Sequence, residues 1–145
     1  MASLQKIEAT ILRETLADLA SIQGLIPLAG SPGHYKIFWR FVPDSIEMPY
    51  IVLRHLAGGH DNDTTSEASD SLWKIDGVTV DYATRESLSD AIAELHRKDP
   101  ISTTFPNSCG YTWITEELPT HEVKLAENHP ILYVGGIYRL RLSHN

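Results

Sequence analysis

Cysteine and long apolar runs are scarce in this sequence, and each scarcity narrows what the protein can be. Cys109 is the single cysteine in 145 residues, so the chain cannot close an internal disulfide and its fold needs no oxidising compartment. No apolar run reaches the roughly 20 residues that cross a bilayer. Residues 1–12 lack the basic region and cleavage site of a signal peptide. We therefore expect a protein that stays in the cytoplasm where it is made and binds no membrane.

Positive charge is also scarce, which argues against a nucleic-acid-binding surface. The chain has 12 Lys and Arg against 19 Asp and Glu, a formal net charge of −7. Tight binding to nucleic acid needs clustered cations that displace counterions. The two densest basic stretches, at 96–98 and 139–141, are too short to form such a patch.

What the sequence does contain is a regular alternation of apolar and polar residues, which predicts one α+β domain over residues 1–145. Apolar spacing of three and four predicts amphipathic helices at 4–22 and 84–99, with Thr84 capping the second. The second helix should bury Leu88, Ala91, Ile92 and Leu95. Alternation with period two predicts strands at 35–42, 50–57, 72–83, 111–118, 120–126 and 131–143, the last with Tyr138, Leu140 and Leu142 on one side. This order favours a mainly antiparallel sheet of about five strands with both helices packed on one face.

A polar stretch at 58–71 interrupts this pattern and predicts a loop that projects from the body. It holds almost no side chain suited to a core. Its carboxylates stand without a Lys or Arg among them: Asp61, Asp63, Glu67 and Asp70. Connections of about 14 residues are long for a compact domain and are usually functional or disordered. A second irregular segment is expected at 100–111.

A search for catalytic and metal-binding motifs finds none. His121 and Glu122 begin like a zinc-protease helix, but the position that requires a second histidine is Leu125. Glycine-rich phosphate loops and a serine elbow are also missing from the sequence. We therefore predict that the protein is not an enzyme and has no catalytic residue, metal ion or cofactor. His96 is expected to cap the second helix as an imidazolium.

Four segments, taken in chain order, resemble one protein family. They are the amphipathic N-terminal helix, the P-Y-I-V strand at 49–52, the V-x-V-D-x strand at 78–82 followed directly by a helix, and the terminal Y-R-L-R-L strand at 138–142. Together with the long polar loop between the first two strands, this series resembles the tail terminator, or tail completion, proteins of long-tailed bacteriophages.

The resemblance implies a structural virion protein of the tail and neck region. Such a protein forms a homohexameric ring that caps the tail tube, ends its polymerisation and joins the tail to a head-closure or neck protein. Genomic DNA passes through the lumen of the ring without sequence-specific binding. The net charge of −7 suits a lumen that repels the duplex and lets it slide.

Subunit or tube contacts are expected at two places. One is the acidic loop at 58–71. The other is a strand with a free edge, at 35–42 or at the C-terminus, because such a strand can pair across subunits. The residues predicted at these contacts are His60, Asp61, Asn62, Asp63, Glu67, Asp70, Trp39, Arg40, Arg139 and Arg141.

The residues leave three alternatives open. The protein could be another neck or minor tail protein, such as a head-closure or tube-like subunit. It could be a small metal-dependent hydrolase with nitrogen and oxygen ligands from His55, His60, Asp61 and Asp63. It could also be an adaptor that binds a peptide along an exposed sheet edge.

Overall fold

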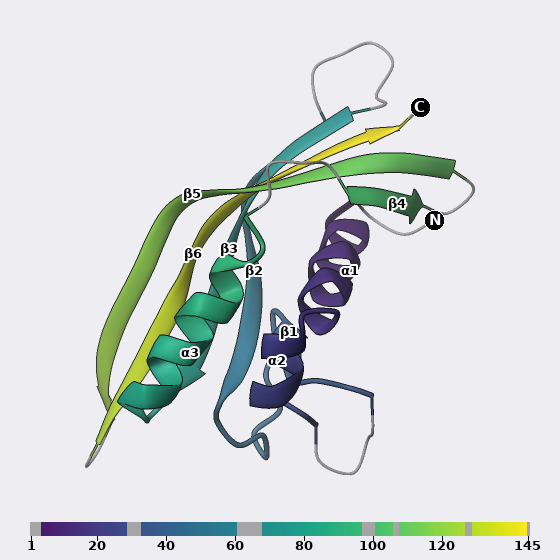
Figure 1. The fold of residues 1–145 in the computed structure, drawn as a ribbon. Helices are drawn as coiled ribbons and strands as arrows, with labels where there is room; N and C mark the ends of the chain where they lie inside the picture. The colour runs from purple at the N-terminus through teal and green to yellow at the C-terminus, as the bar shows by residue number, and fades with distance from the viewer. Residues whose placement is uncertain are drawn as a thin grey trace.

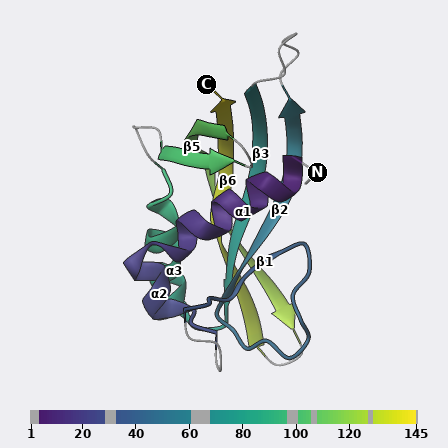
Figure 2. The same ribbon diagram turned by 90° about the vertical axis from the view of Figure 1, so that its right-hand side faces the viewer.

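The computed structural model describes residues 4–28, 33–60, 68–96, 101–105, 108–126 and 129–144. In chain order the elements are α1 (Leu4–Ala17), α2 (Ala20–Leu25), β1 (Ile37–Trp39), β2 (Tyr50–His60), β3 (Ala68–Thr79), α3 (Tyr82–Ala93), β4 (Ile101–Phe105), β5 (Ser108–Ala126) and β6 (His129–His144). The helices lie on one face of a single six-stranded sheet (Figure 1). Figure 2 shows α1 crossing in front of the strands.

The strands follow the order β1-β2-β3-β6-β5-β4, and every neighbouring pair is antiparallel except β1 and β2, which are parallel. Segment 40–49 carries the chain back to the end of the sheet where β1 began, so β2 runs in the same direction. The predicted α+β fold is confirmed. The sheet has six strands where about five were expected, three helices replace the expected two, and the sheet is mixed because of the parallel β1–β2 pair.

One apolar core lies between the helices and the sheet. The predicted inward positions are confirmed because all of them are buried: Leu88, Ala91, Ile92 and Leu95 after or within α3, and Tyr138, Leu140 and Leu142 of β6. Trp73 of β3 is fully buried in this core, and α1 adds Leu12 and Leu16. The hydroxyl of Tyr138 donates to the carbonyl of Ile92 at 3.2 Å, so the polar end of this buried ring is satisfied.

The predicted continuous helix at 4–22 is wrong because the chain breaks it at Leu19. This residue is extended (φ −79°, ψ 122°), and α2 begins at the next position. Ile22 of α2 is fully buried, and the hydroxyl of Ser21 donates to the Glu94 carboxylate at 2.7 Å, just beyond α3. Packing of α2 therefore outweighs the continuous helical spacing.

The strand predicted at 35–42 is much shorter in the structure. β1 ends at Trp39 because Arg40 adopts φ 72°, a left-handed conformation that interrupts a strand. The backbone N–H of Arg40 still donates to the carbonyl of Leu53 at 3.3 Å. Phe41, which would lie on the same side as Trp39 if the strand continued, is 82% exposed.

The projecting loop predicted at 58–71 is shorter than expected. β2 continues to His60 and β3 begins at Ala68, so that Gly58 pairs with Ser71. Gly58 permits this pairing because it has φ 97° and a Cβ there would overlap the backbone of the opposite strand. Ser71 is buried, contrary to the expectation that this stretch joins no core. Residues 61–67 lie outside the described ranges.

The segment predicted to be irregular at 100–111 contains a hairpin, because β4 pairs antiparallel with the first residues of β5. The two short strands predicted on either side of Pro119 are one strand. Its register shifts between Glu116 and Leu118, so the bulge lies on β5 and not at the glycine pair of β6. Proline is tolerated here because this half of β5 has a neighbour on one side only in the described ranges.

Helix α3, predicted from residue 84, begins earlier than expected. Asp81 is its N-cap in place of Thr84, since its carboxylate accepts from the Ala83 N–H at 3.3 Å and from the Thr84 hydroxyl at 2.8 Å. The Thr84 bond first and the Ala83 bond second lower the pKa of Asp81. β3 therefore ends at Thr79, and the V-x-V-D-x segment joins a strand end to a helix start.

A carboxyl group is buried between α1 and β3. Glu8 has no exposed surface, and its Oε1 accepts from the Ser71 hydroxyl at 3.0 Å. Glu8 Oε2 and the indole N–H of Trp73 form no hydrogen bond of good geometry among the described residues, although the indole lies close enough to act on the carboxylate. Burial raises the pKa of Glu8 from 4.5 to about 7, against the lowering effects of Ser71 and Trp73 and with a further rise from the charge of Asp70.

The buried Glu8 predicts that the protein loses stability as pH rises. Between pH 4.5 and about 7 the folded chain keeps a proton on Glu8 that the unfolded chain has released. The free energy of unfolding should therefore fall by roughly 2–3 kcal/mol between pH 5 and 8. Urea titrations across this range should show that Glu8→Gln removes the fall, whereas the exposed control Glu14→Gln on the same helix keeps it. An unchanged fall in Glu8→Gln would contradict this assignment.

Gly135 of β6 lies too close to the backbone of β3 to accept a side chain. It has φ 148°, and a Cβ there would overlap the carbonyl oxygen of Ile75. Gly135→Ala should destabilise the protein by about 2–4 kcal/mol. Gly24→Ala in α2, where a Cβ meets nothing within 4 Å, should be neutral or stabilising by up to about 1 kcal/mol. Thermal unfolding of the two variants measures the difference, and equal melting temperatures would contradict the close approach of β6 to β3.

Candidate functional site

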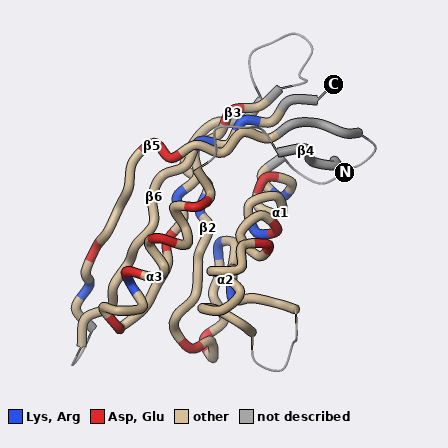
Figure 3. Tube along the Cα trace, viewed as in Figure 1, with Lys and Arg blue, Asp and Glu red and all other residues tan. Residues whose placement is uncertain are grey.

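The face of the sheet opposite the helices, which we call the outer face, carries charged residues from neighbouring strands. Because side chains alternate along a strand, the inward Tyr138 places Arg139 and Arg141 on the outer face. The register sets Asp70 of β3 opposite Arg141 of β6, and Arg141 opposite Trp113 of β5. Figure 3 shows basic and acidic positions close together where the start of β3 lies beside the end of β6.

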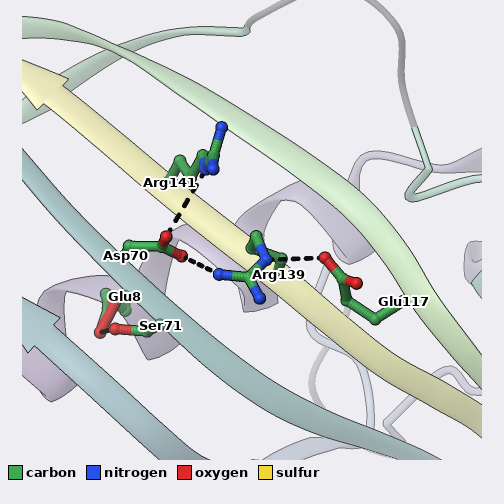
Figure 4. A network of polar contacts seen from close by, with 6 residues as sticks. All are labelled: Glu8, Asp70, Ser71, Glu117, Arg139 and Arg141. Atoms are coloured by element: carbon green, nitrogen blue, oxygen red, sulfur yellow. Dashed lines mark hydrogen bonds and ion pairs between the residues drawn. The ribbon is translucent and has the colours of Figure 1, made fainter.

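Arg139 is the centre of a charged network that joins three strands (Figure 4). Its Nη1 lies 2.8 Å from Asp70 Oδ1 on β3, and its Nε lies 2.7 Å from Glu117 Oε1 on β5. Arg141 Nε lies 3.6 Å from the other oxygen of Asp70. The hydrogen bond to Glu117, and then that to Asp70, raises the pKa of Arg139. The guanidinium group therefore holds β3, β6 and β5 together across the outer face.

Beside this network the outer face is hollowed. The hollow has a volume of about 380 Å³ and is lined by Trp113, Thr115, Glu117, Arg139 and Arg141. The side chain of Arg141 is 62% exposed, compared with 32% for that of Arg139. The walls of the hollow thus offer hydrogen-bond donors, hydrogen-bond acceptors and an indole ring. Such a surface suits a polar protein segment better than duplex DNA, whose phosphates would meet the carboxylate of Glu117.

A second group of charges lies further along the same face. Lys74 Nζ lies 3.3 Å from Glu122 Oε1 and 3.8 Å from Asp76 Oδ2. Asp76 is 3% exposed, and burial raises its pKa while Lys74 lowers it. Gly135 stands opposite Asp76 in the register, and the Lys74 side chain reaches from β3 past β6 to Glu122 of β5.

The predicted contact residues divide into three sets. Asp70, Arg139 and Arg141 come together in the network on the outer face. Trp39 and Arg40 lie apart from it at β1, where the Arg40 guanidinium stacks 4.3 Å from the Trp39 ring and donates to Gln5 at 3.0 Å. The third set lies outside what the structure describes: Asp61, Asn62, Asp63 and Glu67, together with the side chain of His60, the last residue of β2.

Glu117 and Trp113 belong to the outer-face site although the sequence did not single them out for it. Glu117 reaches Arg139 because it lies two residues after Thr115, the cross-strand neighbour of Arg139, and therefore on the same face of the sheet. Trp113 lines the hollow as the cross-strand neighbour of Arg141. The pair Glu116-Glu117 was the available signal, but only the β5–β6 register says which arginine it meets.

The metal-site alternative finds no support in the part of the chain that is described. His55 packs edge-on against Trp73, with ring centroids 5.3 Å apart, on the helix-covered side of the sheet. No group of three His, Cys, Asp or Glu residues in the described ranges could hold a metal ion. Asp61 and Asp63, the carboxylates of this hypothesis, fall outside those ranges.

His96 has a different role from the imidazolium cap that the sequence predicts. Its Nδ1 accepts a hydrogen bond from the backbone N–H of Glu116 at 3.0 Å, so this nitrogen acts as an acceptor toward β5. The donor is an N–H at the register shift of β5. His96 thus covers a backbone group where the strand is irregular.

None of the described helices combines the length and apolar character needed to span a bilayer.

The network around Arg139 yields a prediction about salt. Asp70→Asn and Glu117→Gln should each lower the urea midpoint, because each substitution removes a charged partner of Arg139. Both losses should shrink in 1 M NaCl, where the Debye length is about 3 Å. The control Asp90→Asn, an exposed carboxylate of α3, should change little at either salt concentration. Asp70 or Glu117 variants as stable as wild type at low salt would show that Arg139 does not hold the strands.

Comparison with known proteins assigns no family to the chain, since no family model and no curated protein matches it.

Proposed function

We propose that this protein is a tail terminator of a long-tailed bacteriophage. It acts without catalysis, as a ring of identical subunits that caps the tail tube and joins the tail to the head-closure or neck protein. Its partners are copies of itself, the tail tube protein and the neck protein, and its place is the tail and neck region of the virion.

The observation that carries the proposal is the arrangement of the two central motifs. The P-Y-I-V segment lies at the start of β2 and the V-x-V-D-x segment at the end of β3, with Tyr50 paired to Val78 and Ile51 to Gly77. Asp81 then begins α3 directly. Two short motifs that are distant in the sequence therefore form one continuous unit, β2, β3 and α3. A resemblance concentrated in one folded unit is stronger support than separate short matches.

The outer face supports a role in assembly. Its charged side chains form ion pairs within the same subunit, as Arg139 does with Asp70 and Glu117. A surface of balanced charges beside an exposed arginine suits contact with other proteins. The net charge of −7 suits a lumen through which DNA passes without sticking.

Purified protein mixed with assembled tail tubes tests the proposal. We expect rings of six subunits in negative-stain images, or added density at one end of each tube. Light scattering should give the matching mass, and tubes capped in this way should stop growing. Chelation should leave capping unchanged.

Other outcomes would favour the alternatives. A monomer that ignores the tubes would refute the terminator role. Binding to isolated head connectors but not to tubes would indicate another neck protein. Bound zinc or manganese, with a hydrolytic activity that chelation abolishes, would indicate the metal enzyme.

A further inference from the structure

Exposed apolar side chains gather at the two free edges of the sheet. Of the large apolar side chains exposed in the described ranges, Phe41 (82%) and Leu56 (47%) lie at the β1–β2 edge. Leu118 (54%), Val123 (53%) and Leu125 (90%) lie on β5, beside the opposite edge. The remaining two, Val80 and Tyr82, flank the start of α3. Exposed apolar side chains beside an open strand edge can be covered by a partner chain that pairs with that edge.

The β1–β2 edge is open because β1 is short. It pairs with residues 51–53 of β2, and beyond Leu53 no described strand lies along that side of β2. The left-handed conformation of Arg40 turns the chain at this point and leaves Phe41 in solvent. Leu56 falls where the β2–β3 register shifts. This edge therefore offers unpaired β2 backbone after Leu53 and an exposed aromatic side chain just after β1.

The β5 edge is open because β4 is short. β4 pairs with residues 108–112, and within the described ranges no strand pairs with the same side of β5 after Thr112. His96 accepts the N–H of Glu116, which removes one donor at the bend. Figure 1 shows the long free arm of β5 after this bend, at the far side of the sheet from β1 and β2. An uncovered strand of this length is a template for pairing with another chain.

The two edges also differ in charge. The β1–β2 edge, with the segment that follows β1, carries Lys36, Arg40 and Arg54 against Asp44 and Glu47. Among the described residues none of these three cations forms an ion pair within 4 Å, although the charge of Arg54 acts on Asp76 across the sheet. The matching stretch of β5 carries three carboxylates and one lysine: Glu116, Glu117, Glu122 and Lys124. Glu117 and Glu122 bind cations of the same chain through Oε1 only. One edge is therefore basic and the other acidic, each with apolar side chains beside it.

We infer that the free edge of β5 in one copy docks on the β1–β2 edge of a second copy. Leu125 and Val123 would pack near Phe41 and Leu56, with strand pairing between the backbones and the glutamates facing Arg54 and Lys36. Unlike edges make a head-to-tail contact, which repeats from copy to copy and closes a ring when the rotation allows it. This inference deepens the proposed ring and rests on it, since it names the surfaces that join neighbouring subunits.

Two charge-bearing variants test the contact because each disables one edge. Phe41→Asp leaves β5 intact, and Leu125→Asp leaves the β1–β2 edge intact; both positions are largely exposed, so the fold should be kept. Sedimentation of each variant alone should show self-association at least about tenfold weaker than wild type. A mixture of the two should form a one-to-one dimer and stop there, because that pair has a single intact contact. Ser87→Asp adds the same charge at an exposed position of α3 that does not line the hollow between α3 and β5; it is the control and should associate like wild type.

The outcomes separate this contact from the ring itself. A wild type that forms rings while both variants do so equally well overturns the edge contact and leaves the terminator proposal standing. A mixture that stays monomeric while the separate variants are monomeric also overturns it, because a head-to-tail contact must be restored. A wild type that remains monomeric at every concentration overturns the edge contact, and the tube-capping experiment then decides the function by itself. Phe41→Ser and Leu125→Ser repeat the test if either aspartate variant is less stable than wild type in urea.

Discussion

The pairing of β3 with β6 through the middle of the sheet is the constraint on which the other features depend. Its register runs without interruption from Ala68 opposite Ser143 to Thr79 opposite Leu132. This register sets Trp73 beside Tyr138 under the helices and Asp70 beside Arg141 on the outer face. A slip by one residue would exchange the two faces and drive Arg139 and Arg141 into the core. One ladder thus determines both the apolar core and the charged surface.

Segments that follow a single period were predictable from the sequence, and segments held by distant partners were not. α3 and β6 keep one spacing throughout, so their buried residues could be named in advance. Ser71 looked like a loop residue, yet it is buried because Glu8, 63 positions away, accepts its hydrogen bond. Pro119 looked like a break, yet β5 passes through it because the strand has a partner on one side there. Local pattern carries no information about either partner.

The outer-face site was half predictable for the same reason. Asp70, Arg139 and Arg141 could be named from charge and alternation, but their meeting depends on the register of β3 with β6. Glu117 lies two residues after Thr115, the cross-strand partner of Arg139, so alternation along β5 places it on the outer face once the β5–β6 register is known. The register shift after Glu116 then places Leu118, paired with Ile137, on the same face. The local pattern of the sequence does not say which strand lies beside β5 or in which register.

The charge of the chain and its apolar edges act in opposite directions on association. A net charge of −7 repels two copies that approach at random, which protects the long free edge of β5 from indiscriminate pairing. At the β1–β2 edge the cations Lys36, Arg40 and Arg54 outnumber the carboxylates Asp44 and Glu47 and so weaken this repulsion. Two β5 edges that met would place Glu117 and Glu122 against their own copies, whereas a β5 edge that meets the β1–β2 edge finds opposite charge. Repulsion between like edges therefore selects the head-to-tail arrangement, and specificity comes as much from the rejected contact as from the accepted one.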